Sequence, residues 1–283
     1  MTIPNGLKVL PKDERDLKLG AVITLPALSE LPLSYRLPKT TIKSQIDDFC
    51  SGTACTAILE TTEGKELDEL WYFAKSKEIS GDVDEFGQDL RTAMKTAVKF
   101  GAISKAVAPF TKDKGSDFLR RIENYSKDLE WKAGEHKQKS YFFITGKYDA
   151  FDNARASLWA FRDLKRGAIM GLEFGWPLSQ TYLLGTPSGY GHAMKVDGFE
   201  TVNGENWIVL QQSYGTQAGK DGYQWISRET FNAYADTYGV GMFIDLPADE
   251  AKFHNKWKIP LKYNWIAKIV FSFRDLLGMG SAR

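Results

Sequence analysis

The sequence predicts an α+β protein in which a largely helical half precedes a half built mainly of β-strands. Two observations support this. Between about residues 55 and 100, apolar residues recur at the three-to-four-residue spacing of amphipathic helices. From about residue 141 onward, the pattern changes to short apolar runs bounded by Gly, Pro and Asn, which is typical of strands. Helices followed by strands favour separate packing of the two types, and therefore the α+β class.

Three helices are expected in the first half. The first opens at Cys55 and is followed, after a turn at Glu63-Gly64, by a second helix. The third runs from Gly87 to Phe100 and stops at Gly101. The charged segment 112–140 fits either an exposed helix or an excursion from the domain, and its conformation stays open.

The second half is expected to contain four clear strands and one helix. The helix spans Asp152 to Lys165, and Val202-Asn203-Gly204-Glu205 predicts a hairpin turn. The strands cover residues 141–144, 168–174, 193–196 and 207–210.

Segments of different character flank these halves. Residues 1–30 are rich in proline and charge and predict an extended arm, 31–245 form the main domain, and 246–283 form a C-terminal extension. Within the domain, the helical half covers about 45–110 and the β half about 140–245. An amphipathic helix is expected at 263–277. Docking on the chain's own body is the favoured role of its apolar face, a protein partner comes second and a membrane surface third.

Composition excludes several classes of function. Lys and Arg number 37 and Asp and Glu 36, so the net charge of +1 does not favour nucleic acid or an anionic membrane. No apolar run is long enough to span a membrane, no secretory signal is seen, and two cysteines are too few for a disulfide framework. No metal-ligand spacing or phosphate loop occurs, so no cofactor is expected. We expect a cytoplasmic or virion-associated protein that is not secreted by a signal peptide.

One cysteine and one histidine stand in contexts that suit nucleophilic chemistry. Small, turn-favouring residues lead from Ser51 into an apolar helical run, so Cys55 is expected at the first turn of a helix, where free N–H groups favour a thiolate. From the local sequence alone, a buried structural cysteine is an equal alternative. His192 follows small residues and begins an apolar strand, whereas His136 and His254 lie in charged surroundings typical of the surface.

The order of these residues resembles the papain-like cysteine peptidases. In that family the nucleophile begins a helix, the histidine begins a strand, and an orienting Asn heads an Asn-Ser-Trp-Gly motif, which Gln212-Ser213-Tyr214-Gly215 resembles here. The resemblance extends over most of residues 30–240 and includes Lys220 to Ile226, similar to the Gly-Tyr strand that follows the amide motif. It implies a helical half packed against an antiparallel, barrel-like half with the active site between them.

The resemblance also implies roles for individual residues. Cys55 is the nucleophile, His192 the general base, Gln212 the orienting residue, Gln45 the oxyanion donor, and Tyr214 the aromatic shield that the family builds from tryptophan. Gln212 departs from the usual Asn, and Gln45 lies ten residues before Cys55 where the family has six. The short stretch before Leu31 and the lack of disulfides suggest the bacterial or phage-borne branch, without control by removal of a pro-segment.

The sequence therefore fits two functions. The first is thiol-dependent hydrolysis of peptide or other amide bonds, with peptides or proteins as substrates. The second is a papain-like fold with little or no turnover, serving as a structural or binding component of a phage particle or another assembly. The presence of both Cys55 and His192 favours the first function. The departures at Gln212 and Gln45 and the apolar face of the C-terminal helix favour the second.

Overall fold

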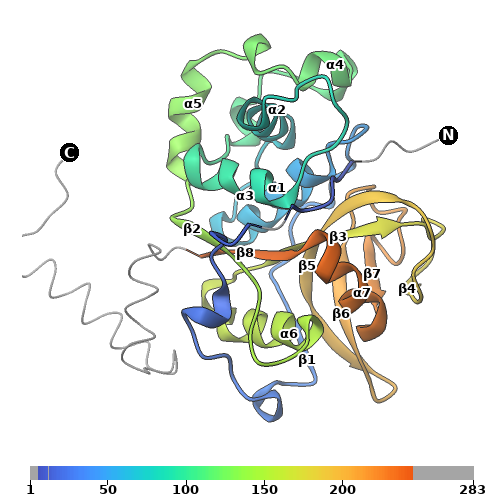
Figure 1. Cartoon of the computed structure of the whole chain (residues 1–283). Helices are drawn as coiled ribbons and strands as arrows, with labels where there is room; N and C mark the ends of the chain where they lie inside the picture. Colours follow the sequence, from blue (N-terminus) through green and yellow to red (C-terminus); the bar gives the residue numbers. More distant parts are fainter. Residues whose placement is uncertain (1–5, 12, 245–283) are drawn as a thin grey trace, which may run out of the picture.

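The computed structural model describes residues 6–11 and 13–244, which form two packed sides (Figure 1). The predicted α+β class is confirmed. Helices α1 to α5 lie together on one side, and the sheet lies on the other with α6 and α7. The α-helices are α1 Cys50–Glu63, α2 Glu69–Ser80, α3 Leu90–Lys99, α4 Ser116–Leu119, α5 Asp128–Ala133, α6 Ala150–Ala160 and α7 Arg228–Tyr238.

Local sequence explains where most of these helices begin and end. Asp68 caps α2 by accepting from the Trp71 backbone N–H at 2.7 Å, and Asp89 caps α3 by accepting from the Thr92 N–H at 3.0 Å. Gly64 and Gly81 end α1 and α2 in the left-handed conformation that glycine adopts without strain.

The expected start of α1 at Cys55 is wrong, because the helix begins at Cys50. Ser51 and Gly52 look like turn residues in the sequence, yet both are helical and buried. A Cβ atom at Gly52 would lie 3.0 Å from the Glu69 carbonyl oxygen and from the Phe73 side chain. Glycine is therefore needed here because α1 and α2 pack against each other at this point, and this tertiary contact overrides its low helix propensity.

The charged segment 112–140 forms short helical pieces that pack on the helical side. Besides α4 and α5 it contains one-turn helices at Lys112–Lys114, Ile122–Asn124 and Gly134–His136. Leu119, Tyr125 and Leu129 bury their side chains in small apolar clusters with residues of α2. The segment is thus anchored to the domain by a few apolar residues.

The strands form one eight-stranded, mostly antiparallel sheet. Its order is β2-β8-β3-β5-β6-β7-β4, and β1 pairs with β5 beside this path. The sheet is not closed into the barrel that the resemblance implied. The strands are β1 Ser34–Arg36, β2 Ser140–Phe143, β3 Ala168–Phe174, β4 Tyr182–Leu183, β5 Tyr190–Val202, β6 Glu205–Gln211, β7 Tyr223–Ile226 and β8 Val240–Ile244.

The strand predictions agree with the observed elements. The turn between β5 and β6 falls at Asn203-Gly204, where both residues have positive φ (52° and 84°), as a tight hairpin turn requires. The expected helix 152–165 is present as α6 with a one-turn helix at Arg162–Leu164. Helix α1 packs on β5, so the start of α1 lies against the strand that carries His192.

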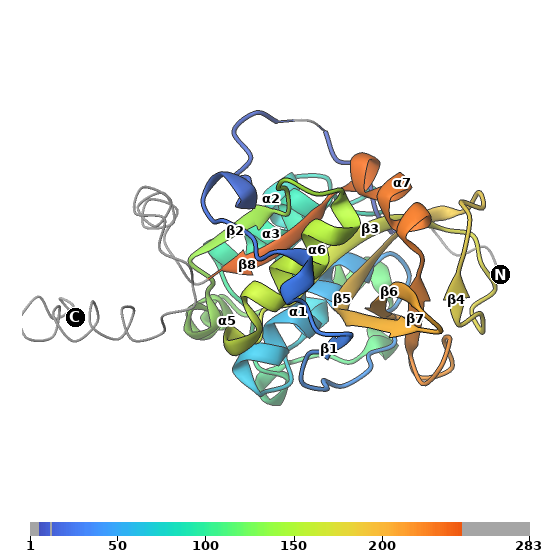
Figure 2. The same cartoon turned by 90° about the horizontal axis from the view of Figure 1, so that it is seen from below.

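The N-terminal arm is extended and follows the join between the two sides. Leu7 bridges to Gln88 just before α3, the Leu10 N–H donates to the Thr237 carbonyl on α7 at 3.3 Å, and Lys18 bridges to Phe143 on β2. Figure 2 shows this part of the arm, drawn in dark blue, passing over the molecule from α7 toward β2. Further one-turn helices follow at Leu19–Ala21 and Leu28–Glu30 before β1.

No helix in the described part of the chain is long and apolar enough to cross a membrane. The C-terminal extension 246–283, with the helix expected at 263–277, lies outside the described residues.

Candidate active site

The first turn of α1 places the Cys50 sulfur against strand β5. The backbone N–H of Ala193, the residue after His192, donates to this sulfur, and the N–H groups of Cys50 and Ser51 also favour its thiolate form. The Cys50 and Ser51 amides belong to the start of a helix, where backbone donors have no partner within the helix. The sulfur that meets the His192 strand is therefore that of Cys50.

Cys55 occupies a different environment. Five residues along a helix correspond to a rotation of about 140° and a rise of about 7.5 Å, so the two sulfurs point to different parts of the molecule. Cys55 is completely buried and hydrogen-bonds to Tyr72 on α2, and burial raises the pKa of its thiol to about 12. The structure thus puts Cys55 in the core between helices, which is the buried structural alternative. A bond between the two cysteines is excluded by this geometry.

The ring of His192 is held in one tautomer by Gln212. The Nε2 atom lies 2.9 Å from Gln212 Oε1, and the same oxygen accepts the backbone N–H of Ser213 at 2.9 Å. Because an amide oxygen only accepts, Nε2 carries the proton and Nδ1 presents its lone pair. Nδ1 is buried and has no hydrogen-bond partner. It is therefore an available base.

The side chains of Gln224 and Tyr214 hold the hydrogen-bonded His192 and Gln212 in place. Gln212 donates its Nε2 to Gln224 Oε1 at 2.9 Å, and Gln224 in turn donates to the Gln180 carbonyl at 2.6 Å. Tyr214 stacks on the His192 ring with centroids 4.8 Å apart and an angle of 13° between the planes. The bonds of Gln212 to Ser213 and Gln224 show how the longer glutamine reaches the imidazole: its side chain folds back beside its own backbone.

Comparison with known proteins assigns the fold. No family model and no curated protein matches the sequence, whereas solved structures match over most of the chain. Xylellain, a cysteine protease from Xylella fastidiosa, has a TM-score of 0.68 at 17% identity, covering 87% of this chain and 98% of xylellain. Procathepsin B S9 from Trypanosoma congolense has a TM-score of 0.59 at 14% identity and covers 84% and 85%. Bromelain from Ananas comosus has a TM-score of 0.55 at 15% identity and covers 75% and 99%.

The fold is papain-like. It is the fold of cysteine proteases, and the site lies between the two sides that such a fold joins.

Within the papain-like fold, Gln45 lies close to Gln212 in space. Its backbone N–H donates to the Ser213 carbonyl at 2.6 Å, and it precedes Cys50 by five residues in the sequence. Its side-chain amide donates to the Asp47 carbonyl at 2.5 Å, and its Oε1 is buried without a partner. Counted to Cys50 instead of Cys55, the spacing is close to the six residues usual in the family.

Burial keeps the Cys50 thiol and the His192 imidazole uncharged. It raises the pKa of the Cys50 thiol to about 12, against the opposing effect of the Ala193 N–H. It lowers the pKa of His192 to about 4, against the opposing effect of Gln212. Desolvation disfavours the charged form of each group, so the described conformation holds a neutral thiol and a neutral imidazole.

The N-terminal arm contributes to the burial of Cys50, because it covers the sulfur. A Cβ atom placed on Gly6 would lie 2.7 Å from Cys50 Sγ and 3.3 Å from the Asp48 carbonyl oxygen. The next residue, Leu7, is almost fully buried, and its N–H donates to the Gly191 carbonyl at 2.9 Å. A substrate carbonyl cannot reach the sulfur while Gly6 is in this position.

The arm fills a groove between the two sides as a short extended strand. On the helical side, the Gln88 N–H donates to the Gly6 carbonyl at 3.3 Å and the Lys8 N–H donates to the Gln88 carbonyl at 3.2 Å. On the sheet side the leucine side chain rests on Gly171, where a Cβ atom would lie 2.4 Å from Leu7 Cδ2. Gly171 therefore makes the space that this leucine fills.

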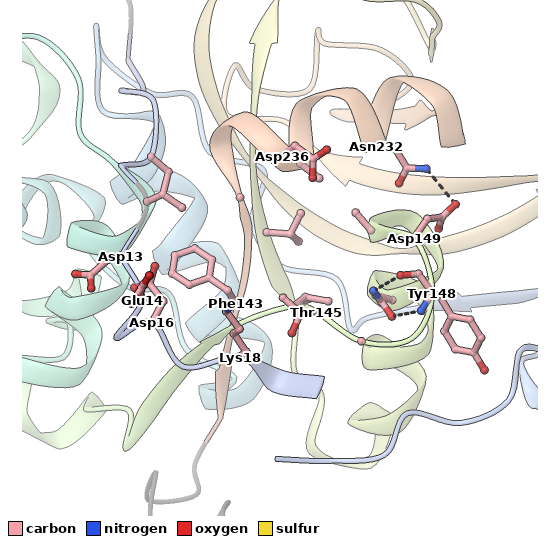
Figure 3. Close-up of a pocket in the computed structure, with 18 of the residues that line it drawn as sticks. Asp13, Glu14, Asp16, Lys18, Phe143, Thr145, Tyr148, Asp149, Asn232 and Asp236 are labelled. Carbon is pink, nitrogen blue, oxygen red and sulfur yellow. Dashed lines mark hydrogen bonds between the residues drawn. The ribbon is translucent and has the colours of Figure 1, made fainter. Parts of the chain in front are cut away.

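A separate hollow of about 740 Å³ lies farther along the arm and contains none of these groups (Figure 3). Some of its polar lining groups bond to one another: Asp149 accepts from Asn232 Nδ2 at 3.1 Å, and Asn153 exchanges hydrogen bonds with the Tyr148 backbone. It is lined by acidic residues of the arm and of α7 and by the segment that leads from β2 into α6. Among the described residues, no group of three or more His, Cys, Asp or Glu is arranged to hold a metal ion.

The structure brings His192, Gln212, Gln45 and Tyr214 together, and it shows three features that the sequence does not reveal. Cys50 lies at the start of α1, which begins five residues before the expected position. Gln224 was noted only as part of a strand, and nothing in the sequence showed that Gly6 covers the sulfur. The expectation that His136 lies on the surface is also wrong, because it is buried and its Nδ1 lies 2.9 Å from Glu63 Oε2.

Proposed function

We propose that this chain hydrolyses peptide bonds, with Cys50 as nucleophile, His192 as general base and Gln212 as the residue that orients the imidazole. The observation that carries the proposal is the unpaired, buried Nδ1 of His192, whose other nitrogen is bound to Gln212, on the strand that contacts the Cys50 sulfur. A nucleophile beside a base that a third group orients is the arrangement that thiol hydrolysis requires.

The reaction follows from the tautomer. Nδ1 of His192 takes the thiol proton as the Cys50 sulfur forms a bond to the substrate carbonyl carbon. The imidazolium then returns the proton to the amine nitrogen as the C–N bond breaks, which leaves a thioester on the sulfur. Water, deprotonated by the same nitrogen, attacks the thioester and releases the acid and the thiol. Gln212 keeps Nε2 protonated throughout.

The negative charge on the tetrahedral intermediate needs donors. We assign this role to the Cys50 backbone N–H at the start of α1 and to the side-chain amide of Gln45, once that amide leaves the Asp47 carbonyl. A donor of this kind contributes about 3 kcal/mol to transition-state stability in comparable sites. Gln45 thus keeps its expected role, with Cys50 in place of Cys55 as the nucleophile.

Turnover requires that residues 6–10 leave the groove. The arm excludes both water and substrate from the sulfur, so the described conformation is the closed form of the proposed enzyme. The expectation that removal of a pro-segment does not control the protein stays a prediction, and we add the proposal that the arm controls access by leaving the groove without being removed.

The test is hydrolysis of denatured casein and of fluorogenic peptides by the full chain. Cys50→Ala is expected to abolish turnover, and Cys55→Ala, the matched control, is expected to retain it. Turnover that survives Cys50→Ala and disappears in Cys55→Ala would overturn the assignment.

The alternative is a papain-like component of an assembly, such as a phage particle, with little or no turnover. The covered sulfur favours this alternative, because a scaffold has no need of an open groove. It predicts that no peptide is cleaved even when substitutions in the arm expose Cys50 to alkylation.

A further inference from the structure

The arm carries a lysine whose ammonium group is held by two carboxylates at the rim of the groove. Lys8 Nζ lies 2.6 Å from Glu85 Oε2 and also pairs with Asp82. These two residues belong to the loop between α2 and α3, which reaches the groove at Gln88. The two carboxylates at the edge of the groove therefore hold the ammonium group of Lys8, which belongs to the extended segment that covers Cys50.

The loop that bears the two carboxylates is fixed in place. The buried Lys77 donates to the Glu85 carbonyl at 2.7 Å and to the Gly87 carbonyl at 2.6 Å. The Gly87 N–H donates to the Asp48 carboxylate at 2.6 Å. Because both anchors are buried, the carboxylates are presented on a rigid support and not on a loose surface loop.

The position of Lys8 relative to Cys50 is set by the backbone of the groove. Gly6 lies on the sulfur, Leu7 pairs with Gln88 and fills the space over Gly171, and Lys8 comes next at the rim. Backbone donors and acceptors on both walls would hold another extended peptide that runs in the same direction in the same way, whatever its side chains. Selectivity then depends on the side chains that meet the walls.

We infer that Asp82 and Glu85 form a subsite that selects a basic side chain, Lys or Arg, two residues away from the substrate residue at Cys50. The inference rests on the proposed function and adds a substrate class to it. In the closed form this subsite is occupied by Lys8 of the chain itself.

Binding can be measured without turnover. The probe is a fluorescent peptide with the sequence of residues 6–10, Gly-Leu-Lys-Val-Leu. The comparison peptide is identical except for Gln in place of Lys. The protein is the full chain with G6A and K8Q, which weaken docking of its own arm. Two partly exposed ion pairs predict that the Lys peptide binds about 2- to 30-fold more tightly by fluorescence anisotropy.

The preference is expected to disappear when D82N and E85Q are added together. It is expected to persist with D84N, the matched control, because Asp84 lies on the same loop but pairs with Arg121. E85Q alone, which leaves the Asp82 contact with Lys77 intact, is expected to reduce the preference. Equal binding of the two peptides, or a preference that persists in the double variant, would overturn the subsite.

Cleavage sites in casein, mapped by mass spectrometry, separate this inference from the proposed function. Enrichment of Lys or Arg two positions from the cleaved residue supports the subsite, and cleavage without enrichment overturns it. If the chain with G6A and K8Q, in which docking of the arm is weakened, cleaves no casein while the binding preference holds, the hydrolase proposal fails and the subsite stands.

Discussion

Substitution of Gly6 by alanine is expected to open the groove. The added Cβ would lie 2.7 Å from Cys50 Sγ and 3.3 Å from the Asp48 carbonyl oxygen, both closer than ordinary contacts. Overpacking of this kind costs about 1–3 kcal/mol. Because the arm can relieve the clash by leaving, and 1.4 kcal/mol corresponds to a factor of ten, the open fraction should rise about 5- to 150-fold.

The assay is the rate at which iodoacetamide alkylates Cys50, located by tandem mass spectrometry. A sulfur that reacts only in the open form is modified in proportion to the open fraction, so the rate should rise by the same factor. Gly134→Ala is the control, because a Cβ there meets no atom within 4 Å. An unchanged rate in Gly6→Ala, with the same unfolding midpoint as the parent chain, would refute the argument that the arm controls access.

Three further predictions test the remaining parts of the site. Gln212→Ala should lower kcat/KM about 10- to 100-fold with little change in KM, because the His192 tautomer is no longer fixed, and an unchanged kcat/KM would count against the orienting role. Burial lowers the pKa of His192 to about 4, so between pH 7 and pH 4 the imidazole takes up a proton in the unfolded chain but largely stays neutral in the folded chain. The free energy of unfolding should therefore fall by about 3 kcal/mol over this range. Urea unfolding of the parent chain and of His192→Gln measures this, and an equal pH dependence in both would contradict it. Cys55→Ala should cost about 1–2 kcal/mol of stability with kcat/KM unchanged, and a large loss of activity would revive Cys55 as the nucleophile.

Local patterns in the sequence predicted much of the fold. The β5–β6 hairpin follows from Asn203-Gly204, which adopt the positive φ that such a turn needs. The end of α3 near Gly101 and the strand 168–174 follow from periodicity and glycine placement. These features depend on neighbours in the sequence, so one sequence suffices to read them.

The start of α1, and with it the place of Cys50, could not be predicted in this way, because it depends on a tertiary contact. Helix α2 packs so closely on Gly52 that an added Cβ atom would lie 3.0 Å from atoms of Glu69 and Phe73. Local propensity does not reflect this contact, and it puts the expected helix start five residues too late, at Cys55 instead of Cys50. The cover over the sulfur involves Gly6, which is far from Cys50 in the sequence, and no local signal shows such a contact. The place of His136 likewise depends on a partner, Glu63, that lies on another element.

The proposal depends on which sulfur reacts. An epoxide that alkylates thiols, added in slight excess to Gly6→Ala and followed by tandem mass spectrometry, identifies the modified cysteine directly. The adduct is predicted on Cys50, with its formation strongly reduced by His192→Ala. An adduct on Cys55, or one on Cys50 that forms equally fast without the imidazole, would contradict the account.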